Sequence, residues 1–498
     1  MTNHIPTVAL ISLQNTYIDF GIRYIASSCR KAGLNVHVLW ITREPTDPFD
    51  RNSCDAIARW LEEKEVDLVG IGLMSVHVNR ASLLTQTIQT KTRIPVIWGG
   101  VHAIVDPVSC LNIADYVCTG DGELSFVELA SRLAAKNEPE GIDNIWFQRN
   151  GEILRTPRRQ ISDLDSFPPP DYELNTHWTL RDQSVFPLDE HILRNGIPWI
   201  LKRHHTISSR GCPHACSYCY NTALKRFFGD EHYLRIRSVD KLMSEINGII
   251  EQYPFIETIS IMDDSFLFKP DGWLEEFSAK FKKTGRTFGL LVHPKTLTRD
   301  RIDMLIDAGL IGFQMGLQSG SERISRGIYN RSESVDDFIQ TTRLLDEYMD
   351  RLHARTIDVI VDNPYETDED QEETIKVLSG IKKPFHIQLF SLTLYPETDL
   401  YRRMVAEKKP IPAEMLPENK EYLKFKPTLM NRLIWMTHST SRSTVLFFMR
   451  NRKTWWGKFL FEIYYHCWEK GLRIGLRKVK HILREFLKFA RRPAMHSP

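Results

Sequence analysis

The chain has 498 residues, of which 42% are hydrophobic, 26% are charged and 10% are aromatic. This composition excludes a wholly disordered, collagen-like or small disulfide-rich protein, and the length is sufficient for several domains. The net charge of +2 is the sum of two unlike parts. Residues 431–498 hold 15 Lys and Arg and 3 Asp and Glu, a net charge of +12, whereas the remaining residues hold 50 Lys and Arg and 60 Asp and Glu, a net charge of −10.

The N-terminus, MTNHIPTVALISL, has no basic segment before its first apolar run, which argues against a secretory signal. No apolar run reaches the roughly 18–20 residues that span a bilayer. We therefore expect a cytoplasmic protein that is soluble or binds peripherally to a membrane.

Residues 1–140 alternate short β-branched runs with amphipathic stretches. Strands are expected at Val8–Leu13, Val36–Trp40, Leu68–Leu73, Val96–Trp98 and Tyr116–Cys118. Strands separated by helices predict right-handed βαβ units, and hence an α/β, doubly wound, Rossmann-like domain over residues 1–140.

Turn signals follow several of these strands, at the edge where doubly wound sheets bind ligands. They are Ser75, Gly99-Gly100 and Gly120-Asp121-Gly122-Glu123. Glycine permits close approach of the backbone to a ligand, but a tight turn explains each signal as well.

Residues 141–195 are typical of a connector. Asn150-Gly151 between two short apolar runs predicts a hairpin. Pro168-Pro169-Pro170 cannot lie in a helix interior or a central strand. We therefore expect a hairpin and a proline-rich linker between two domains.

Residues 196–405 repeat the strand–helix pattern. The expected strands are Thr206–Ser209, Thr258–Met262, Phe288–Val292, Gly312–Gly316, Thr356–Val361 and His386–Thr393. Six such units predict a partial (β/α)6 barrel, whose chemistry would lie at the carboxyl ends of the strands. Residues 406–498 are expected to form a basic, aromatic, helical C-terminal region.

Three of the eight cysteines fall within eight residues, after the first expected barrel strand. Cys212, Cys216 and Cys219 have the spacing C-x3-C-x2-C. Three thiolates at this spacing can hold one side of an iron–sulfur cluster and leave one iron open to an exogenous chelator. A chance cluster or an incomplete zinc site is the alternative.

This motif, followed by six strand–helix units, resembles the radical S-adenosylmethionine (SAM) enzymes over residues 205–400. The resemblance implies that Cys212, Cys216 and Cys219 hold a 4Fe–4S cluster, that SAM chelates the free iron, and that one electron cleaves SAM to a 5′-deoxyadenosyl radical. An external electron donor of the flavodoxin or ferredoxin type is implied too.

Other strand ends match the same family, with departures. Met262-Asp263-Asp264 stands where relatives have a glycine-rich segment, and Gln318-Ser319 where many have Glu-Ser. Asp362 begins a segment, Asp-Asn-Pro-Tyr-Glu-Thr, where relatives have Gly-x-Pro-x-Glu-Thr, although a capped helix start explains its Glu-Thr pair equally well. The SAM-binding residues implied by the resemblance are Tyr218, Met262, Asp263, Asp264, Gln318, Ser319 and Asp362.

The N-terminal domain is similar to the cobalamin-binding domain of one radical SAM subclass, through Pro95–Ala103, Ala114–Glu123 and Asp67–Gly72. The cobalamin-binding residues implied are Ser75, Gly99, Gly100, His102, Gly120 and Glu123. The motif Asp-x-His-x-x-Gly, which supplies a histidine to cobalt, is absent after the first strand, so cobalamin would bind without it; a vestigial, empty domain is the alternative.

The C-terminal region interleaves basic and aromatic residues over Arg450–Arg492, and Leu472–Phe489 is predicted as a basic amphipathic helix. This pattern is typical of contact with a membrane surface. Packing on the barrel explains it also, and nucleic-acid binding is the least favoured interpretation.

The resemblance implies methylation of an unactivated carbon of a small-molecule or lipid-like substrate, with cobalamin as methyl carrier. A ring-forming or rearranging enzyme with the same cofactors is the first alternative, and a non-catalytic cobalamin or redox sensor is the second. No residue is assigned as a catalytic acid or base.

Overall fold

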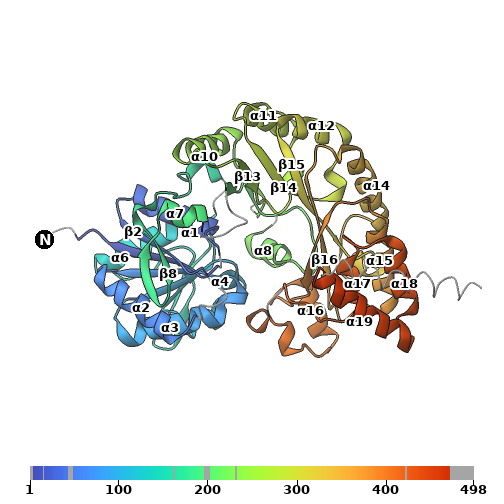
Figure 1. Cartoon of the computed structure of the whole chain (residues 1–498). Coiled ribbons are helices and arrows are strands. Elements are labelled where there is room, and N and C mark those ends of the chain that lie inside the picture. Colours follow the sequence, from blue (N-terminus) through green and yellow to red (C-terminus); the bar gives the residue numbers. More distant parts are fainter. Residues whose placement is uncertain are drawn as a thin grey trace, which may run out of the picture.

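The computed structural model describes residues 4–14, 16–42, 49–160, 163–195, 202–229, 233–420 and 423–471. Two large sheets organise these residues, one in each half of the chain (Figure 1). The predicted amphipathic stretch Leu472–Phe489 lies outside the described residues. Within them, no helix is long and apolar enough to cross a bilayer.

The first sheet has the described strand order β7-β6-β5-β4-β3-β1-β2-β8-β9. Strands β1 to β5 are parallel, which confirms the doubly wound prediction. The chain adds β2 on one side of β1 and then adds β3, β4 and β5 on the other side, so the strand order reverses between β1 and β3. Doubly wound sheets bind ligands beyond the carboxyl ends of the strands at this point. The bounds are β1 Thr7–Ser12, β2 Asn35–Trp40, β3 Leu68–Gly72, β4 Val96–Gly99, β5 Tyr116–Cys118, β6 Ile145–Arg149, β7 Glu152–Leu154, β8 His177–Arg181 and β9 Ser184–Pro187.

Helices cover both faces of this sheet. Because alternate strand residues face opposite sides, Ala9 and Ile11 pack beneath α2 and α3, whereas Val8 and Leu10 pack beneath α1 and α6. The helices are α1 Phe20–Lys31, α2 Arg51–Glu63, α3 Val78–Lys91, α4 Val101–Val105, α5 Pro107–Leu111, α6 Glu123–Ala134 and α7 Glu190–Asn195, with a 3-10 turn, η1, at Ser75–His77.

Residues 141–195, predicted as a hairpin and linker, supply both edges of the first sheet. The hairpin is present: β6 pairs antiparallel with β5, and Asn150 and Gly151 turn it into β7 with positive φ. Beyond the prolines, β8 pairs with β2 and folds back as β9. The chain therefore returns to the first domain before it enters the second.

The second sheet has six parallel strands in sequential order, which confirms the partial barrel. Its first strand begins three residues earlier than predicted, and Ser209 belongs to a separate short strand that pairs with β12. The bounds are β10 Arg203–Thr206, β11 Ser209–Arg210, β12 Arg235–Ile236, β13 Thr258–Ile261, β14 Thr287–Val292, β15 Leu310–Gln318, β16 Ala354–Val361 and β17 His386–Ser391.

Helices cover the outer side of the curved sheet, while α8 lies on its inner side, between the sheet and the first domain (Figure 1). Phe277, Phe281 and Phe288 are fully buried between α11 and β14, and each contributes roughly 1.5–3 kcal/mol by burial. The helices are α8 Tyr220–Phe228, α10 Val239–Gln252, α11 Asp271–Lys282, α12 Arg299–Ala308, α13 Glu322–Ser325, α14 Val335–Leu345, α15 Asp368–Gly380 and α16 Asp399–Ala406.

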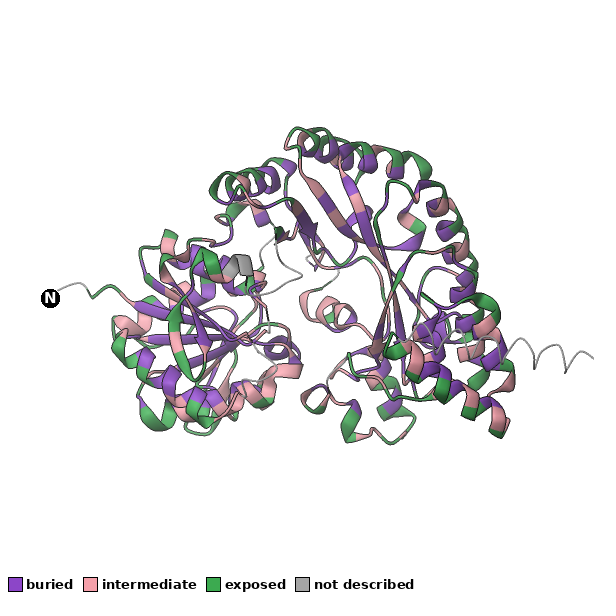
Figure 2. Cartoon of the chain, viewed as in Figure 1, coloured by how far each residue is buried: buried purple, intermediate pink, exposed green. Residues whose placement is uncertain are grey.

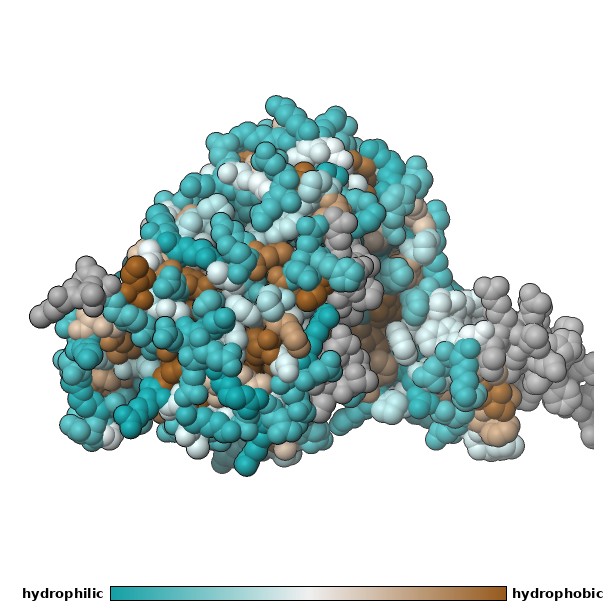
Figure 3. Space-filling model, turned by 60° about the vertical axis from the view of Figure 1, so that its left-hand side comes forward, coloured by the Kyte–Doolittle hydropathy of each residue, from teal (hydrophilic) through white to brown (hydrophobic). Residues whose placement is uncertain are grey.

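The described part of the C-terminal region packs on the barrel. Helices α17 (Leu429–Met436) and α18 (Arg442–Asn451) lie against α15 and each other, and α19 (Trp455–Glu469) packs on α18. Their aromatic residues Phe448, Phe461 and Tyr464 join the barrel core, so packing accounts for much of the aromatic content. Buried residues follow the strands and the inner faces of the helices throughout (Figure 2), and hydrophilic residues predominate on the face drawn in Figure 3.

Candidate functional site

The three cysteines of the predicted motif lie in one loop, between β11 and α8. Cys212 is buried, Cys216 and Cys219 are half-buried, and Cys219 is the N-cap residue of α8. Gly211 turns the chain into this loop with φ 90°, and a Cβ there would meet the Tyr233 carbonyl oxygen at 2.5 Å. Glycine is therefore required at the entry to the loop.

The thiol donor set fits a 4Fe–4S cluster. All three cysteines are free, and burial raises the pKa of Cys219 to about 12, with the neighbouring Asp264 carboxylate adding to the effect. Bound iron would supply the positive charge that thiolates need here. In the described ranges no three His, Cys, Asp or Glu residues converge on a single metal ion. A cluster does not require this convergence, because each of its thiolates binds a different iron atom.

Aromatic and charged side chains support the loop from the barrel. The His214 ring stacks on His293 with centroids 3.8 Å apart, and His293 Nε2 lies 2.6 Å from the Glu333 carboxylate. Arg331 pairs with Glu333 and donates a hydrogen bond to the Tyr218 hydroxyl at 2.9 Å. Tyr218, a predicted SAM-binding residue, is therefore held in place beside the cysteines.

Three predicted SAM-binding residues follow β13. Asp263 is buried, and its carboxylate accepts hydrogen bonds from the Ser208 and Ser209 amides at 2.6 and 3.1 Å and from Lys269 Nζ at 2.5 Å. These contacts bind β13 to the start of the cysteine loop. Met262 is exposed.

Asp264 differs from Asp263 because no lysine pairs with it in the described part of the chain. Its side chain lies beside Asn221, and the surrounding protein, with the Asp263 charge, raises the pKa of Asp264 to about 6. It also contributes to the raised pKa values of Cys212 and Cys219. Asp264 and Met262 are therefore the two residues of this segment that remain available to a ligand.

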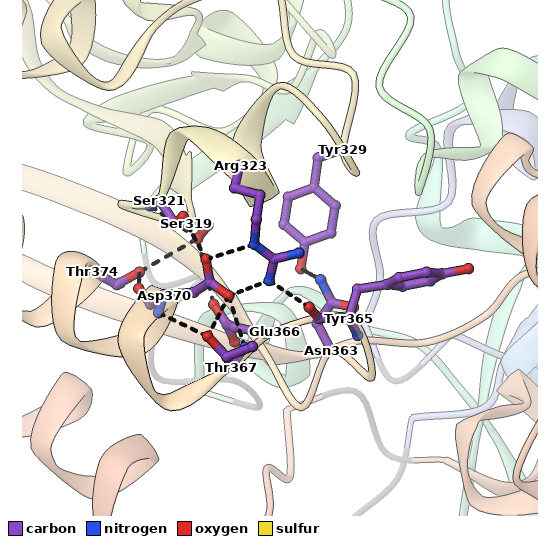
Figure 4. A network of polar contacts seen from close by, with 10 residues as sticks. All are labelled: Ser319, Ser321, Arg323, Tyr329, Asn363, Tyr365, Glu366, Thr367, Asp370 and Thr374. Atoms are coloured by element: carbon purple, nitrogen blue, oxygen red, sulfur yellow. Dashed lines mark hydrogen bonds and ion pairs between the residues drawn. The ribbon is translucent and has the colours of Figure 1, made fainter.

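Gln318 and Ser319 lie at the carboxyl end of β15. Gln318 has φ 62°, and its Oε1 is buried without a hydrogen-bond partner in the described residues. Ser319 Oγ lies 3.4 Å from both Glu366 Oε1 and Thr374 Oγ1 (Figure 4). The unpartnered buried oxygen of Gln318 is an acceptor that a ligand donor can complete.

Glu366 is a candidate residue that the sequence prediction did not select. Thr367 and Asp370 form the capping box of α15, which explains the threonine of the Glu-Thr pair but not Glu366. Burial, with the charge of Asp370, raises the pKa of Glu366 to about 8, and its Oε2 has no partner among the described residues. Arg323 pairs with Asp370 instead (Figure 4).

Asp362 has φ 63°, and its carboxylate accepts hydrogen bonds from Ser391 Oγ, from the Lys426 amide at 3.0 Å and from Asn431 Nδ2 at 2.8 Å. These contacts join the end of β16 to β17 and to α17. Its SAM-binding role stays a prediction.

A second unpredicted group lies on the inner face of the barrel. Gln314 Nε2 donates to both Asp358 oxygens at 2.9 Å and lies 3.4 Å from Gln388 Oε1. Burial raises the pKa of Asp358 to about 7. Along β16, Ile357 and Val359 pack in the core between the sheet and its helices. Because alternate strand residues face opposite sides, Asp358 between them faces the interior of the barrel, and a polar residue between two apolar ones is the sequence signal for this position.

The carboxyl edge of the first sheet meets the cysteine loop. Ser75 Oγ lies 2.7 Å from His102 Nδ1 and also contacts the hydroxyl of Tyr220, the residue after Cys219. Tyr220 in turn packs on Tyr395, with ring centroids 4.4 Å apart. Helix α4 contacts α8 at the same junction.

Features of this edge fit a large ligand held by backbone. Gly100 is exposed and has φ 93°, and a Cβ there would meet the Leu73 carbonyl oxygen at 2.7 Å. Gly99 is half-buried and has only ordinary contacts. His77 Nδ1 is buried without a partner in the described chain.

Gly120 and Glu123 lie at the junction with the barrel. A Cβ on Gly120 would meet Asn144 Oδ1 at 2.6 Å. Arg210 pairs with Glu123 and with Asp121 at 2.7 Å, and Arg235 pairs with Asp121 at 2.5 Å. Glu123 therefore belongs to an ion-pair cluster between the domains, and Gly120 lies against Asn144. Their role toward cobalamin stays a prediction.

Comparison with known proteins identifies both halves of the chain. The B12 binding domain model matches residues 6–130, and the radical SAM superfamily model matches residues 206–378. A methyltransferase of Pyrococcus horikoshii, itself uncharacterized, is 25% identical over 363 residues, which cover 70% of this chain and 72% of the relative. An anaerobic magnesium-protoporphyrin IX monomethyl ester cyclase of Cereibacter sphaeroides is 24% identical over 374 residues, covering 72% of this chain but 55% of the cyclase.

Two solved structures share the fold. The radical SAM methyltransferase TsrM of Kitasatospora setae superposes with a TM-score of 0.65 at 16% identity, covering 80% of this chain and 76% of TsrM. The cobalamin-dependent radical SAM enzyme OxsB superposes with a TM-score of 0.64 at 14% identity, covering 98% of this chain and 75% of OxsB. The chain therefore belongs to the radical SAM superfamily, and to those of its enzymes that carry a B12 binding domain.

Proposed function

We propose that this chain is a cobalamin-dependent radical SAM methyltransferase that methylates an unactivated carbon of a small molecule. The observation that carries the proposal is the contact between Tyr220 and Ser75. It joins the residue after the third cysteine to the carboxyl edge of the B12 binding domain. A methyl carrier and a radical source must both reach one substrate atom, and a contact between the two proposed sites supports such an arrangement.

The residues proposed to hold the cofactors form three groups. Cys212, Cys216 and Cys219 would hold the cluster. Tyr218, Met262, Asp264, Gln318 and Ser319 would bind SAM, and Ser75, Gly99, Gly100 and His102 would bind cobalamin. When bound, these groups supply reductive cleavage of SAM to a 5′-deoxyadenosyl radical and a carrier for the methyl group.

The protein's own part is orientation and exclusion of water. The Arg331–Glu333 pair and the His214–His293 stack hold the loop. The raised pKa values of Glu366 and Asp358 reduce the charge that these two carboxyl groups carry near neutral pH. Neutral carboxyl groups can donate as well as accept hydrogen bonds. The lumen is therefore suited to a polar substrate group held by Asp358, Gln314 and Gln388.

Anaerobic reconstitution with iron, sulfide and cobalamin tests the proposal. We expect cluster absorbance, bound cobalamin, and formation of both 5′-deoxyadenosine and S-adenosylhomocysteine, the coproduct of methyl transfer, from SAM under reduction. Replacing Cys212, Cys216 or Cys219 by Ala should abolish 5′-deoxyadenosine, whereas Cys467→Ala, in α19, should not. Absence of cluster absorbance in the wild-type chain would refute the assignment.

Ring formation is the second candidate, favoured by the likeness to the cyclase. It predicts 5′-deoxyadenosine without S-adenosylhomocysteine. A cobalamin or redox sensor predicts neither product from an intact cluster. The two products therefore separate the three functions in one assay.

We further propose that the C-terminal region contacts an anionic membrane surface through residues 450–492, close to a lipid-like substrate. Supporting this, Trp455, Phe459 and Ile463 are exposed on one face of α19, in a region of net positive charge. The predicted amphipathic helix that would extend this contact lies outside the described residues.

A further inference from the structure

An open pocket of about 390 Å³ lies between the end of α8 and the first domain. It is formed where residues 156–160, which follow β7, approach the end of α8. Three arginines and three aromatic rings dominate its lining: Arg158, Arg159, Arg235, Trp146, Phe227 and Phe228.

The charges in this pocket are incompletely balanced. Arg159 pairs with Glu128 at 2.7 Å, and Arg235 pairs with Asp121. Arg158 has no ion pair within the described ranges; its guanidinium lies 4.9 Å from the centre of the Phe227 ring and 5.8 Å from that of Phe228.

The rim carries a second such cation. Arg155 is exposed and lies over the Trp146 ring, 5.1 Å from its centre, also without an ion pair in the part of the chain that is described. Together, Arg155 and Arg158 give the mouth of the pocket a positive charge that an anionic partner can neutralise.

Aromatic contacts connect the pocket to the cysteine loop. The Phe228 ring lies 6.3 Å from that of Tyr233, centre to centre. The Tyr233 hydroxyl donates a hydrogen bond to Asn221 Oδ1, and Asn221 Nδ2 donates to Cys219 Sγ at 3.5 Å. A short contact path therefore leads from the solvent-facing pocket to a proposed cluster ligand.

The other side of the loop is covered. Tyr220 contacts Ser75 of the first domain, and Cys212 is buried. A protein partner that must approach the cluster therefore finds an open, positively charged surface at the α8 pocket.

We propose that this pocket and its rim, Arg155 and Arg158 with Phe227 and Phe228, form the docking site of an acidic one-electron carrier protein. The inference rests on the proposed function, because reductive cleavage of SAM needs an electron. In this step the reduced carrier loses one electron and the cluster gains it; no bond forms or breaks and no proton moves.

An electron-transfer complex suits the surface. Such interfaces are small and short-lived, and complementary charge mainly raises the rate of association. Screening by salt weakens this steering. The docking should therefore be fast at low ionic strength and sensitive to charge reversal at the rim.

The test compares Arg155→Glu/Arg158→Glu with the matched control Arg51→Glu/Arg59→Glu, which reverses two exposed arginines of α2. Formation of 5′-deoxyadenosine is measured with a reduced acidic flavodoxin and, separately, with dithionite, which needs no docking site. With flavodoxin at low salt, we expect the rim variant to be about tenfold slower than wild type and the control unchanged. With dithionite, all three should agree, which also shows that the variant is folded.

Flavodoxin binding, measured by calorimetry on the reconstituted protein, gives a readout independent of turnover. We expect the rim variant to bind about tenfold more weakly, and wild-type affinity to fall as salt is raised. Equal rates and equal affinities for the rim variant and wild type would overturn the docking site. If dithionite produces no 5′-deoxyadenosine from wild type, the proposed function fails, while the binding data still decide the docking site.

Discussion

Asp263 and Asp264 are adjacent residues of one type with opposite tasks. Asp263 is buried and saturated by two amides and Lys269, which makes it a structural anchor between β13 and the cysteine loop. Asp264 has a raised pKa and no ion pair with the described residues, which is typical of a residue in a ligand-binding site. The two aspartates therefore differ in role because their surroundings differ, although the side chains are chemically identical.

Asp263→Asn should lower the free energy of unfolding by about 3–5 kcal/mol, because it leaves the buried Lys269 without its counter-charge. Asp264→Asn is the matched control and should change it by less than about 1 kcal/mol, because no buried charge loses a partner. Urea unfolding of both variants measures the difference. Equal destabilisation by the two would contradict the assigned roles.

Glu366 predicts a specific dependence of stability on pH. Because its folded-state pKa is about 8 against an ordinary 4.5, the folded chain binds more protons than the unfolded chain between these values. Its contribution to stability therefore falls as the pH rises through this window. Glu366→Gln keeps the uncharged shape and removes the effect.

The measurement is the apparent Tm near pH 5 and near pH 8. The decrease between the two should be smaller in Glu366→Gln than in wild type, by about 2 °C. Glu369→Gln, at an exposed position of the same helix start, should behave as wild type. A wild-type decrease retained in Glu366→Gln would show that another group titrates there.

At the scale of single residues, the sequence predicted local sites and missed long-range ones. Cys212, Cys216 and Cys219 are close in the chain, so their spacing alone indicates a shared ligand. Asp263 acquires its role from Ser208, 55 residues earlier. Glu366 acquires its raised pKa from burial, for which neighbouring residues give no signal.

At the scale of elements, strands buried on both faces were predictable because their apolar runs are continuous, as in β1 and β3. The edge strands β8 and β9 were not predicted. β8 is His-Trp-Thr-Leu-Arg and β9 ends in proline, so neither has a strong pattern. Their place depends on pairing with β2, which lies far away in the chain.

Helix α19 allows the membrane proposal to be tested on described residues. Trp455 is 79% and Phe459 is 61% exposed, so their replacement by Ser should leave Tm within about 1 °C of wild type. Binding to anionic vesicles at low salt, measured by co-sedimentation, should fall several-fold because two interfacial anchors are lost. Val405→Ser, an exposed apolar position on α16, is the control; a wild-type chain that does not sediment would refute the contact.

At the scale of the whole molecule, Arg210 joins the two domains. Burial alone would lower the pKa of Arg210, but the Glu123 and Asp121 carboxylates raise it, so the buried guanidinium stays charged. The pairs connect residues 87 and 89 positions apart. Sequence patterns predicted each domain, but no local signal could show that these charges face one another.

Arg210→Ala should destabilise the chain by about 3–5 kcal/mol, because it leaves Glu123 buried without a cation. Calorimetry should show the two domains unfolding in better separated transitions. Arg149→Ala is the control: Arg149 also pairs with two carboxylates, Glu138 and Glu140, but on the surface of one domain, where such pairs contribute about 0–1 kcal/mol. Equal effects of both replacements would exclude a role for Arg210 in domain coupling.

Cys219 and Tyr220 are consecutive residues, one facing the proposed cluster and the other touching the B12 binding domain at Ser75. Consecutive Cα atoms lie about 3.8 Å apart whatever the surrounding packing. One peptide bond and one side-chain hydrogen bond therefore connect the proposed cluster ligand to the first domain. A movement of the first domain that keeps the Tyr220–Ser75 hydrogen bond would therefore move the proposed cobalamin edge together with the cysteine loop.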